Sequence, residues 1–178
     1  MIIWIASYPK SGNTWIRSLL SSYLFSDNGK FNFKLLKNIE QFSSKNLSLK
    51  FQKNLSHQTR ISKNWISSQK IINQDNKIRF FKTHNAMCTI NGNKFTDKFN
   101  TLAAIYVVRD PRNLITSLCN HYELSLDEAF GFLTNKKKII FPVHVERGGK
   151  NIEDKGDFNF LSDWSTHYQS WKNINFCP

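Results

Sequence analysis

The sequence has few cysteines and no long apolar run. Its three cysteines, Cys88, Cys119 and Cys177, are odd in number and far apart, and no CxxC pair or cysteine–histidine ligand spacing occurs. This pattern argues against a disulfide framework and a zinc site, and it favours a reducing compartment. No stretch is long and apolar enough to cross a bilayer, and the apolar residues after Met1 lack the basic region of a signal sequence. We therefore expect a cytoplasmic protein without a membrane span.

Acidic residues are also scarce, with 13 Asp and Glu against 25 Lys and Arg, which gives a net charge of +12. The excess of positive charge favours an anionic partner, but it does not distinguish a nucleic acid from a nucleotide or an acidic membrane surface. Hydrophobic residues make up 40% of the chain and aromatic residues 14%, which is typical of a globular protein. The 178 residues fit a single domain, residues 1–178, and no internal repeat is present.

Three short apolar runs, residues 2–6, 78–81 and 102–108, predict buried strands. Polar, loop-like residues and then a helical spacing of apolar residues follow these runs, as in residues 15–23 and 114–122. This alternation is typical of a parallel sheet covered by helices. We therefore predict a three-layer α/β/α fold with a mostly parallel sheet and a nucleotide-binding architecture like that of P-loop proteins.

Other segments give further predictions of local structure. Residues 125–128, Ser-Leu-Asp-Glu, have the form of a capping box and predict a helix through residue 132. A stripe of Trp164, His167, Tyr168 and Trp171 predicts a helix whose aromatic face lies in the core. The polar region 27–77 contains apolar residues, including those at 33–42 and 65–72, that predict helices with solvated faces. Residues 135–157 are expected to form a mobile surface loop over a ligand site.

The segment 7–15, Ser-Tyr-Pro-Lys-Ser-Gly-Asn-Thr-Trp, joins the first predicted strand to a helix. A helix N-terminus presents unpaired N–H groups, so this junction is suited to an anion. A nucleotide triphosphatase loop requires a lysine directly after its second glycine. Here Lys10 precedes the only glycine of the segment, and the third strand ends at the basic Arg109. An ATP-dependent phosphotransferase is therefore disfavoured, although Asp110 keeps that alternative open.

Three segments resemble those of one family. Residues 8–15 (YPKSGNTW) resemble the 5′-phosphosulfate loop of sulfotransferases, and residues 107–117 (VVRDPRNLITS) resemble their 3′-phosphate motif. Residues 81–84 (FKTH) resemble the strand end that carries the family's catalytic histidine. The segments occur in the family's order, each at the end of a predicted strand. The resemblance covers nearly all of this chain but only the N-terminal portion of a usual member, so we expect a domain truncated at its C-terminus.

The resemblance implies a metal-free reaction that moves a sulfuryl group from 3′-phosphoadenosine-5′-phosphosulfate to a hydroxyl or amine by in-line displacement. Adenosine-3′,5′-bisphosphate would be the product, and a small molecule or carbohydrate the acceptor. His84 would be the general base, with Lys10 and Lys82 stabilising the developing negative charge. The resemblance assigns the 5′-phosphosulfate to Lys10, Ser11, Gly12, Asn13 and Thr14, adenine to Trp15, and the 3′-phosphate to Arg109 and Ser117.

Some features depart from the family pattern or leave alternatives. Asn13 stands where members often have threonine, and Asp110 where some have asparagine. The expected truncation predicts slow turnover and self-association through an open sheet edge.

The alternatives are an ATP-dependent phosphotransferase and a non-catalytic nucleotide- or nucleic-acid-binding remnant. The lysines are scattered and no nucleic-acid-binding signature occurs, so we expect no nucleic acid partner. The other histidines, His57, His121, His144 and His167, are expected to be structural or solvated.

Overall fold

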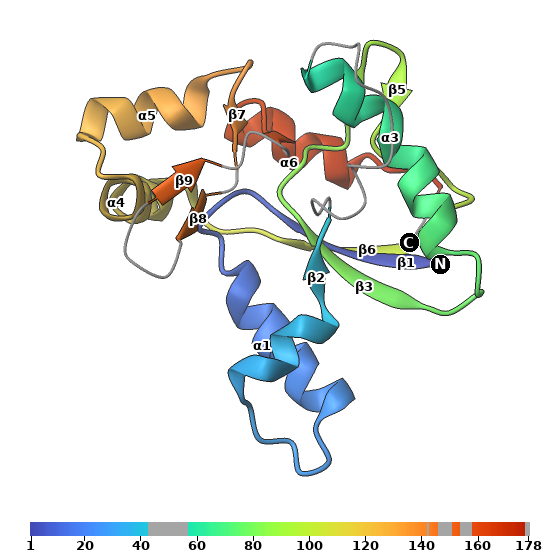
Figure 1. The fold of residues 1–178 in the computed structure, drawn as a ribbon. Helices are drawn as coiled ribbons and strands as arrows, with labels where there is room; N and C mark the ends of the chain where they lie inside the picture. The colour runs from blue at the N-terminus through green and yellow to red at the C-terminus, as the bar shows by residue number, and fades with distance from the viewer. Residues whose placement is uncertain (43–56, 142, 146–150, 154–157, 177–178) are drawn as a thin grey trace.

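A four-stranded parallel sheet organises the chain. The computed structural model describes residues 1–42, 57–141, 143–145, 151–153 and 158–176. Within these residues the main sheet has the order β2-β3-β1-β6, with α1 on one side and α3 and α6 on the other (Figure 1). Its strands are β1 (Ile2–Ser7), β2 (Glu40–Gln41), β3 (Arg79–Thr83) and β6 (Thr101–Val107). The prediction of a mostly parallel sheet flanked by helices is confirmed.

Helices and short antiparallel strand pairs complete the fold. The helices are α1 (Asn13–Phe25), the 3-10 helix η1 (Phe33–Asn38), α3 (His57–Ile72), α4 (Pro111–Tyr122), α5 (Leu126–Thr134) and α6 (Trp164–Lys172). The pairs are β4 (Thr89–Ile90) with β5 (Asn93–Lys94), β7 (Ile139–Ile140) with β10 (Asn159–Phe160), and β8 (Val143–Val145) with β9 (Asn151–Glu153). The predicted capping box at the start of α5 is confirmed, because Ser125 and Glu128 bond each other's backbone N–H.

Two sequence predictions for polar regions need adjustment. The helix expected among residues 33–42 is wrong beyond Asn38, because the chain there becomes extended and β2 pairs with β3. Phe42 donates its backbone N–H to the carbonyl of Lys82 at 2.8 Å, so pairing with the sheet prevails over the helical spacing. The expected loop at 135–157 contains β7, β8 and β9. Its residues 142, 146–150 and 154–157 lie outside the described residues, so its mobility stays a prediction.

Aromatic packing fills the face of the sheet that carries α3 and α6. Trp4 of β1 is fully buried in a cluster with Trp65 of α3 and Trp171 of α6. Its indole N–H donates to the hydroxyl of Thr101 at 2.9 Å, so the buried polar atom has a partner. Burying a side chain of this kind contributes about 1.5–3 kcal/mol. The cluster therefore fixes the central strand between two helices.

A second cluster holds the segment that follows β1. Tyr8 is fully buried among side chains of α4 and α5, including Leu118 and Phe132. Its hydroxyl donates to the carbonyl of Phe132 at 3.1 Å, and burial away from water raises its pKa. The loop after β1 is therefore attached to the core at its first residue rather than free at the surface.

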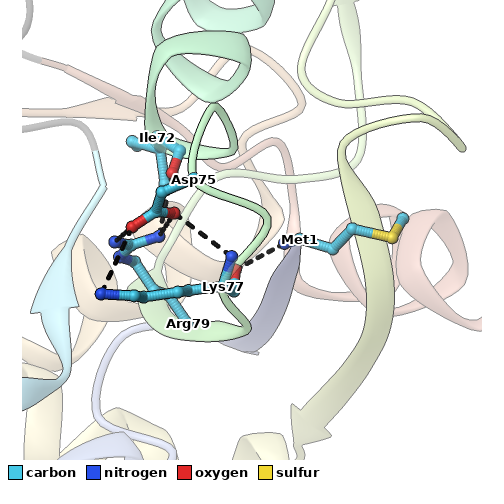
Figure 2. Close-up of polar contacts among 5 residues, drawn as sticks. All are labelled: Met1, Ile72, Asp75, Lys77 and Arg79. Atoms are coloured by element: carbon cyan, nitrogen blue, oxygen red, sulfur yellow. Dashed lines mark hydrogen bonds and ion pairs between the residues drawn. The ribbon is translucent and has the colours of Figure 1, made fainter.

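A polar turn joins the amino-terminal ends of β1 and β3 (Figure 2). The carboxylate of Asp75 accepts two hydrogen bonds from Arg79, at 2.6 and 2.5 Å, and lies 3.8 Å from the ammonium of Lys77. The amino group of Met1 donates to the carbonyl of Lys77 at 2.7 Å, and Arg79 donates to that of Ile72. These contacts align the starts of β1 and β3 with the end of α3.

In the portion of the chain that the structure describes, none of the helices combines the length and the apolar character that a membrane crossing requires.

Candidate functional site

The carboxyl ends of β1, β3 and β6 meet at one edge of the sheet. Ile5 of β1 pairs with Lys82 of β3, and Ser7 pairs with Val107 of β6. A cavity of about 400 Å³ at this edge is lined by Lys82 of β3, by residues that follow the three strands, and by residues of α1 and α4. The lining residues are Pro9, Lys10, Gly12, Asn13, Thr14, Lys82, His84, Arg109, Ser117, His121 and Tyr122. They include cationic groups and no carboxylate, which suits an anionic ligand.

The loop between β1 and α1 borders this cavity and leads into the N-terminus of a helix. Gly12 is the N-cap of α1 with φ +103°, and it offers no side-chain cap to the first N–H groups of the helix. Lys10 also has a left-handed backbone conformation, with φ +67°, which residues other than glycine rarely adopt. The hydroxyl of Ser11 is buried and has no partner within the described part of the chain. The loop therefore combines unpaired donors with the positive end of a helix dipole.

Asn13 faces inward as well as toward the cavity. Its amide nitrogen donates to the carbonyl of Ile5 at 3.0 Å and to the hydroxyl of Ser7 at 3.1 Å. Its side-chain oxygen is buried and has no partner among the described residues. The side-chain nitrogen of Asn13 thus holds the end of β1, and the predicted contact of Asn13 with a phosphosulfate stays a prediction.

His84 is half-buried directly after β3, and its ring is oriented by β1. Its Nδ1 lies 2.8 Å from the carbonyl oxygen of Ser7 and 3.2 Å from the hydroxyl of the same residue. A carbonyl oxygen only accepts, so we assign the proton to Nδ1, which leaves Nε2 as the basic nitrogen. Desolvation, followed by the nearby charge of Lys82, holds the pKa of His84 well below its ordinary value. The ring is therefore neutral at pH 7.

Three cationic side chains, those of Lys10, Arg17 and Lys82, lie close enough together for their charges to interact. Burial, followed by the charges of Arg17 and Lys10, lowers the pKa of Lys82 to about 8. Arg17 of α1 donates to the carbonyls of Leu36 and Ile39, at 3.1 and 2.5 Å, and its own pKa is lowered by burial. A bound anion would offset this repulsion and favour the charged form of Lys82.

Arg109 and Ser117 reach the cavity from the strand–helix connection after β6. Arg109 is exposed and donates to the carbonyl of Lys10 at 3.3 Å, so it bridges two of the three strand ends. Asp110 is engaged elsewhere: its carboxylate caps α4 by accepting the N–H of Arg112 at 2.9 Å and pairs with that guanidinium. No group of three or more His, Cys, Asp or Glu that would hold a metal occurs among the described residues.

Other predicted residues lie outside the lining. Trp15 is 75% exposed and does not line the cavity, and Ser11 is buried within the loop. Sequence reasoning missed His121, which lines the cavity four residues after Ser117. That helical spacing was the available signal, because residues i and i+4 share a helix face. The side chains of His57 and His144 lie outside the described residues.

His167 is fully buried on α6, as the core stripe predicted. Its Nε2 lies 3.0 Å from the carbonyl oxygen of His84, and its Nδ1 lies 2.8 Å from the hydroxyl of Tyr106. A neutral imidazole satisfies both partners, with Nε2 donating and Nδ1 accepting. Burial lowers the pKa of His167 to about 4.

The depressed pKa of His167 predicts a loss of stability in mild acid. Below pH 6.5 the unfolded chain binds a proton at this histidine that the folded chain does not bind until about pH 4. The free energy of unfolding should therefore fall as the pH falls through this window, by roughly 3 kcal/mol from this group. Urea unfolding at several pH values measures the slope. His167→Gln should be less pH-dependent than the wild type, and equal slopes would contradict the prediction.

Two glycine substitutions should have opposite effects. A Cβ at Gly12 or at Gly131 of α5 meets no atom within 4 Å, so only the backbone differs. Gly12→Ala should destabilise by about 1–2 kcal/mol, because its φ is left-handed. Gly131→Ala should stabilise by about 0.5–1 kcal/mol, because alanine favours a helix interior. Urea unfolding of both variants tests this, and shifts in the same direction would rule it out.

Comparison with known proteins agrees with this geometry. The chain matches the family model described as the sulfotransferase domain, over residues 2–175. No curated protein matches the chain. Because the matched region spans nearly the whole sequence, the chain belongs to the sulfotransferase family.

Proposed function

We propose that this protein transfers a sulfuryl group from 3′-phosphoadenosine-5′-phosphosulfate to a hydroxyl or amine of a small molecule or carbohydrate. The observation that carries the proposal is one cavity lined by Lys10, His84, Arg109 and Ser117, which three separate strand ends and α4 supply. The cationic lining and the unpaired donors of the loop fit a nucleotide with phosphates at both ends. The matched sulfotransferase domain supports transferase activity of this class.

In this proposal the nucleotide is held by residues from both sides of the cavity. The loop of Lys10 to Thr14 would bind the 5′-phosphosulfate through its N–H groups and the lysine charge. Arg109 and Ser117 would bind the 3′-phosphate, and the planar guanidinium matches the geometry of phosphate oxygens. The bond from Arg109 to the carbonyl of Lys10 is long and exposed, so exchanging it for a charged oxygen costs little. Trp15 offers an exposed ring for stacking on adenine.

The bound nucleotide supplies the sulfuryl group, and the chain's own residues manage the proton and the charge. Nε2 of His84 accepts the proton of the attacking hydroxyl or amine, because Nδ1 is committed to Ser7. General base catalysis of this kind contributes roughly 10²–10⁴-fold in rate. The ammonium groups of Lys10 and Lys82 stabilise the negative charge that develops as the bond to the leaving phosphate breaks.

Nucleotide selectivity is the first test. Adenosine-3′,5′-bisphosphate should bind at least tenfold more tightly than AMP, because each charge-assisted bond lost with the 3′-phosphate costs about 1.5–3 kcal/mol. Arg109→Ala should remove most of this preference, whereas Arg112→Ala should keep it, because Arg112 is exposed and pairs with Asp110 outside the lining. Calorimetric titration measures these affinities. Equal binding of the two nucleotides, or magnesium-dependent preference for ATP, would instead favour the phosphotransferase alternative.

Turnover is the second test, with labelled 3′-phosphoadenosine-5′-phosphosulfate and a panel of phenols, alcohols, sugars and amines. His84→Ala should lower the rate roughly 10²–10⁴-fold and change nucleotide affinity little. Lys10→Ala should lower turnover more than nucleotide affinity. Lys10→Arg should restore little of the turnover, because a planar guanidinium replaces a compact ammonium. Lys98→Ala is the matched control, since Lys98 lies over the ring of Phe99 outside the lining. Full activity in His84→Ala would overturn the assignment of the base.

A further inference from the structure

One face of α6 bonds the backbone of the segment that carries His84. The side chains on this face lie at positions 167, 170 and 171, a spacing that places them together on a helix. The three bonds join His167 Nε2 to the His84 carbonyl (3.0 Å), Trp171 Nε1 to the Asn85 carbonyl (2.9 Å), and the Met87 N–H to the Ser170 hydroxyl (3.0 Å). A helix near the C-terminal end of the described chain thus holds three of four consecutive residues after β3.

His167 differs from the other two because both of its ring nitrogens bond residues of the sheet and its extensions. The carbonyl of His84 only accepts, so Nε2 of His167 donates to it. Nδ1 then accepts from the hydroxyl of Tyr106 in β6 at 2.8 Å. The ring of Tyr8, in the loop after β1, packs edge-on against His167 with centroids 5.3 Å apart. One buried ring therefore contacts the extensions of β1 and β3 and a residue of β6.

The two ends of His84 are held by different parts of the fold. Its carbonyl accepts from His167 of α6, and its Nδ1 donates to the carbonyl of Ser7 at the end of β1. A half-buried side chain with its backbone and ring both bonded has little freedom to reorient. Losing either bond would allow the ring to rotate and either nitrogen to carry the proton.

We propose that His167 is a positioning residue for His84. By donating to the His84 carbonyl, it keeps the N–H at Nδ1 of His84 bonded to the Ser7 carbonyl and leaves Nε2 of His84 free as the base. This inference rests on the proposed function, in which His84 accepts the acceptor's proton. His167 does not line the cavity, so it acts through His84 and does not touch the reactants. An aliphatic side chain would fill the same core volume, but it would leave the Tyr106 hydroxyl and the His84 carbonyl without their partner.

The test compares His167→Leu, His167→Gln and the wild type as full chains, by nitrogen NMR of the His84 ring across pH. The wild type should show a single tautomer protonated at Nδ1. His167→Leu should show mixed tautomers and a titration shifted upward, because the loosened ring admits water. Glutamine keeps a donor at a similar reach, so His167→Gln should restore most of the wild-type signal. Affinity for adenosine-3′,5′-bisphosphate should stay within about twofold in both variants, because the phosphate-binding residues are untouched.

Two further variants separate positioning from general loss of stability. Leu133→Ala removes a buried side chain of the other cluster and should leave the His84 tautomer unchanged. Tyr106→Phe removes only the hydroxyl that fixes the His167 tautomer, and it tests the same link if His167→Leu fails to fold. An unchanged His84 spectrum in folded His167→Leu or Tyr106→Phe, or the same change in Leu133→Ala, would overturn the proposal. The ring is observed without substrate, so failure of the wild type to bind the nucleotide would count against the proposed function alone.

Discussion

The parallel pairing of β1 with β3 on one side and β6 on the other is the constraint on which the whole site depends. In this arrangement Ser7, His84 and Arg109 leave the sheet at the same edge, although long stretches of chain separate them. An antiparallel neighbour would send its following residues to the opposite edge. The buried Trp4 and the helices packed on it keep β1 central. The geometry of the cavity therefore depends on the packing of the core.

Bringing these strand ends together has an electrostatic cost. Lys82 loses water and lies near the charges of Arg17 and Lys10, and the cavity lining contains no carboxylate that would offset them. The fold tolerates this because Arg17 is held by two carbonyls and because the aromatic clusters supply the stabilisation. An anion that entered the cavity would offset this repulsion and would therefore stabilise the folded chain.

The main strands, the helices that follow them and the capping box were predictable because local spacing encodes them. The convergence of Lys10, His84 and Arg109 followed from one further rule, that parallel strands end together. Residues 33–42 were mispredicted in part, because pairing of β2 with β3 decides their conformation. The inward bonds of Asn13 and the partners of His167 depend on tertiary contacts, which no spacing in the sequence reports. The chemical roles came from resemblance, since Ser117 alone would be an ordinary helix serine.

The long sequence separation of these contacts has a consequence for how the protein is made. Ser7 and His84 are 77 residues apart, His84 and His167 are 83 apart, and Tyr8 reaches Phe132 across 124 positions. Such non-local contacts raise the contact order and slow folding, because long loops must close before any contact forms. During synthesis the loop after β1 leaves the ribosome early, whereas α6, whose His167 packs against Tyr8 of this loop, is translated near the end of the described chain. Until these later segments are made, the strands stay without their helical partners, and the bond between His84 and α6 forms only after His167 has been synthesised.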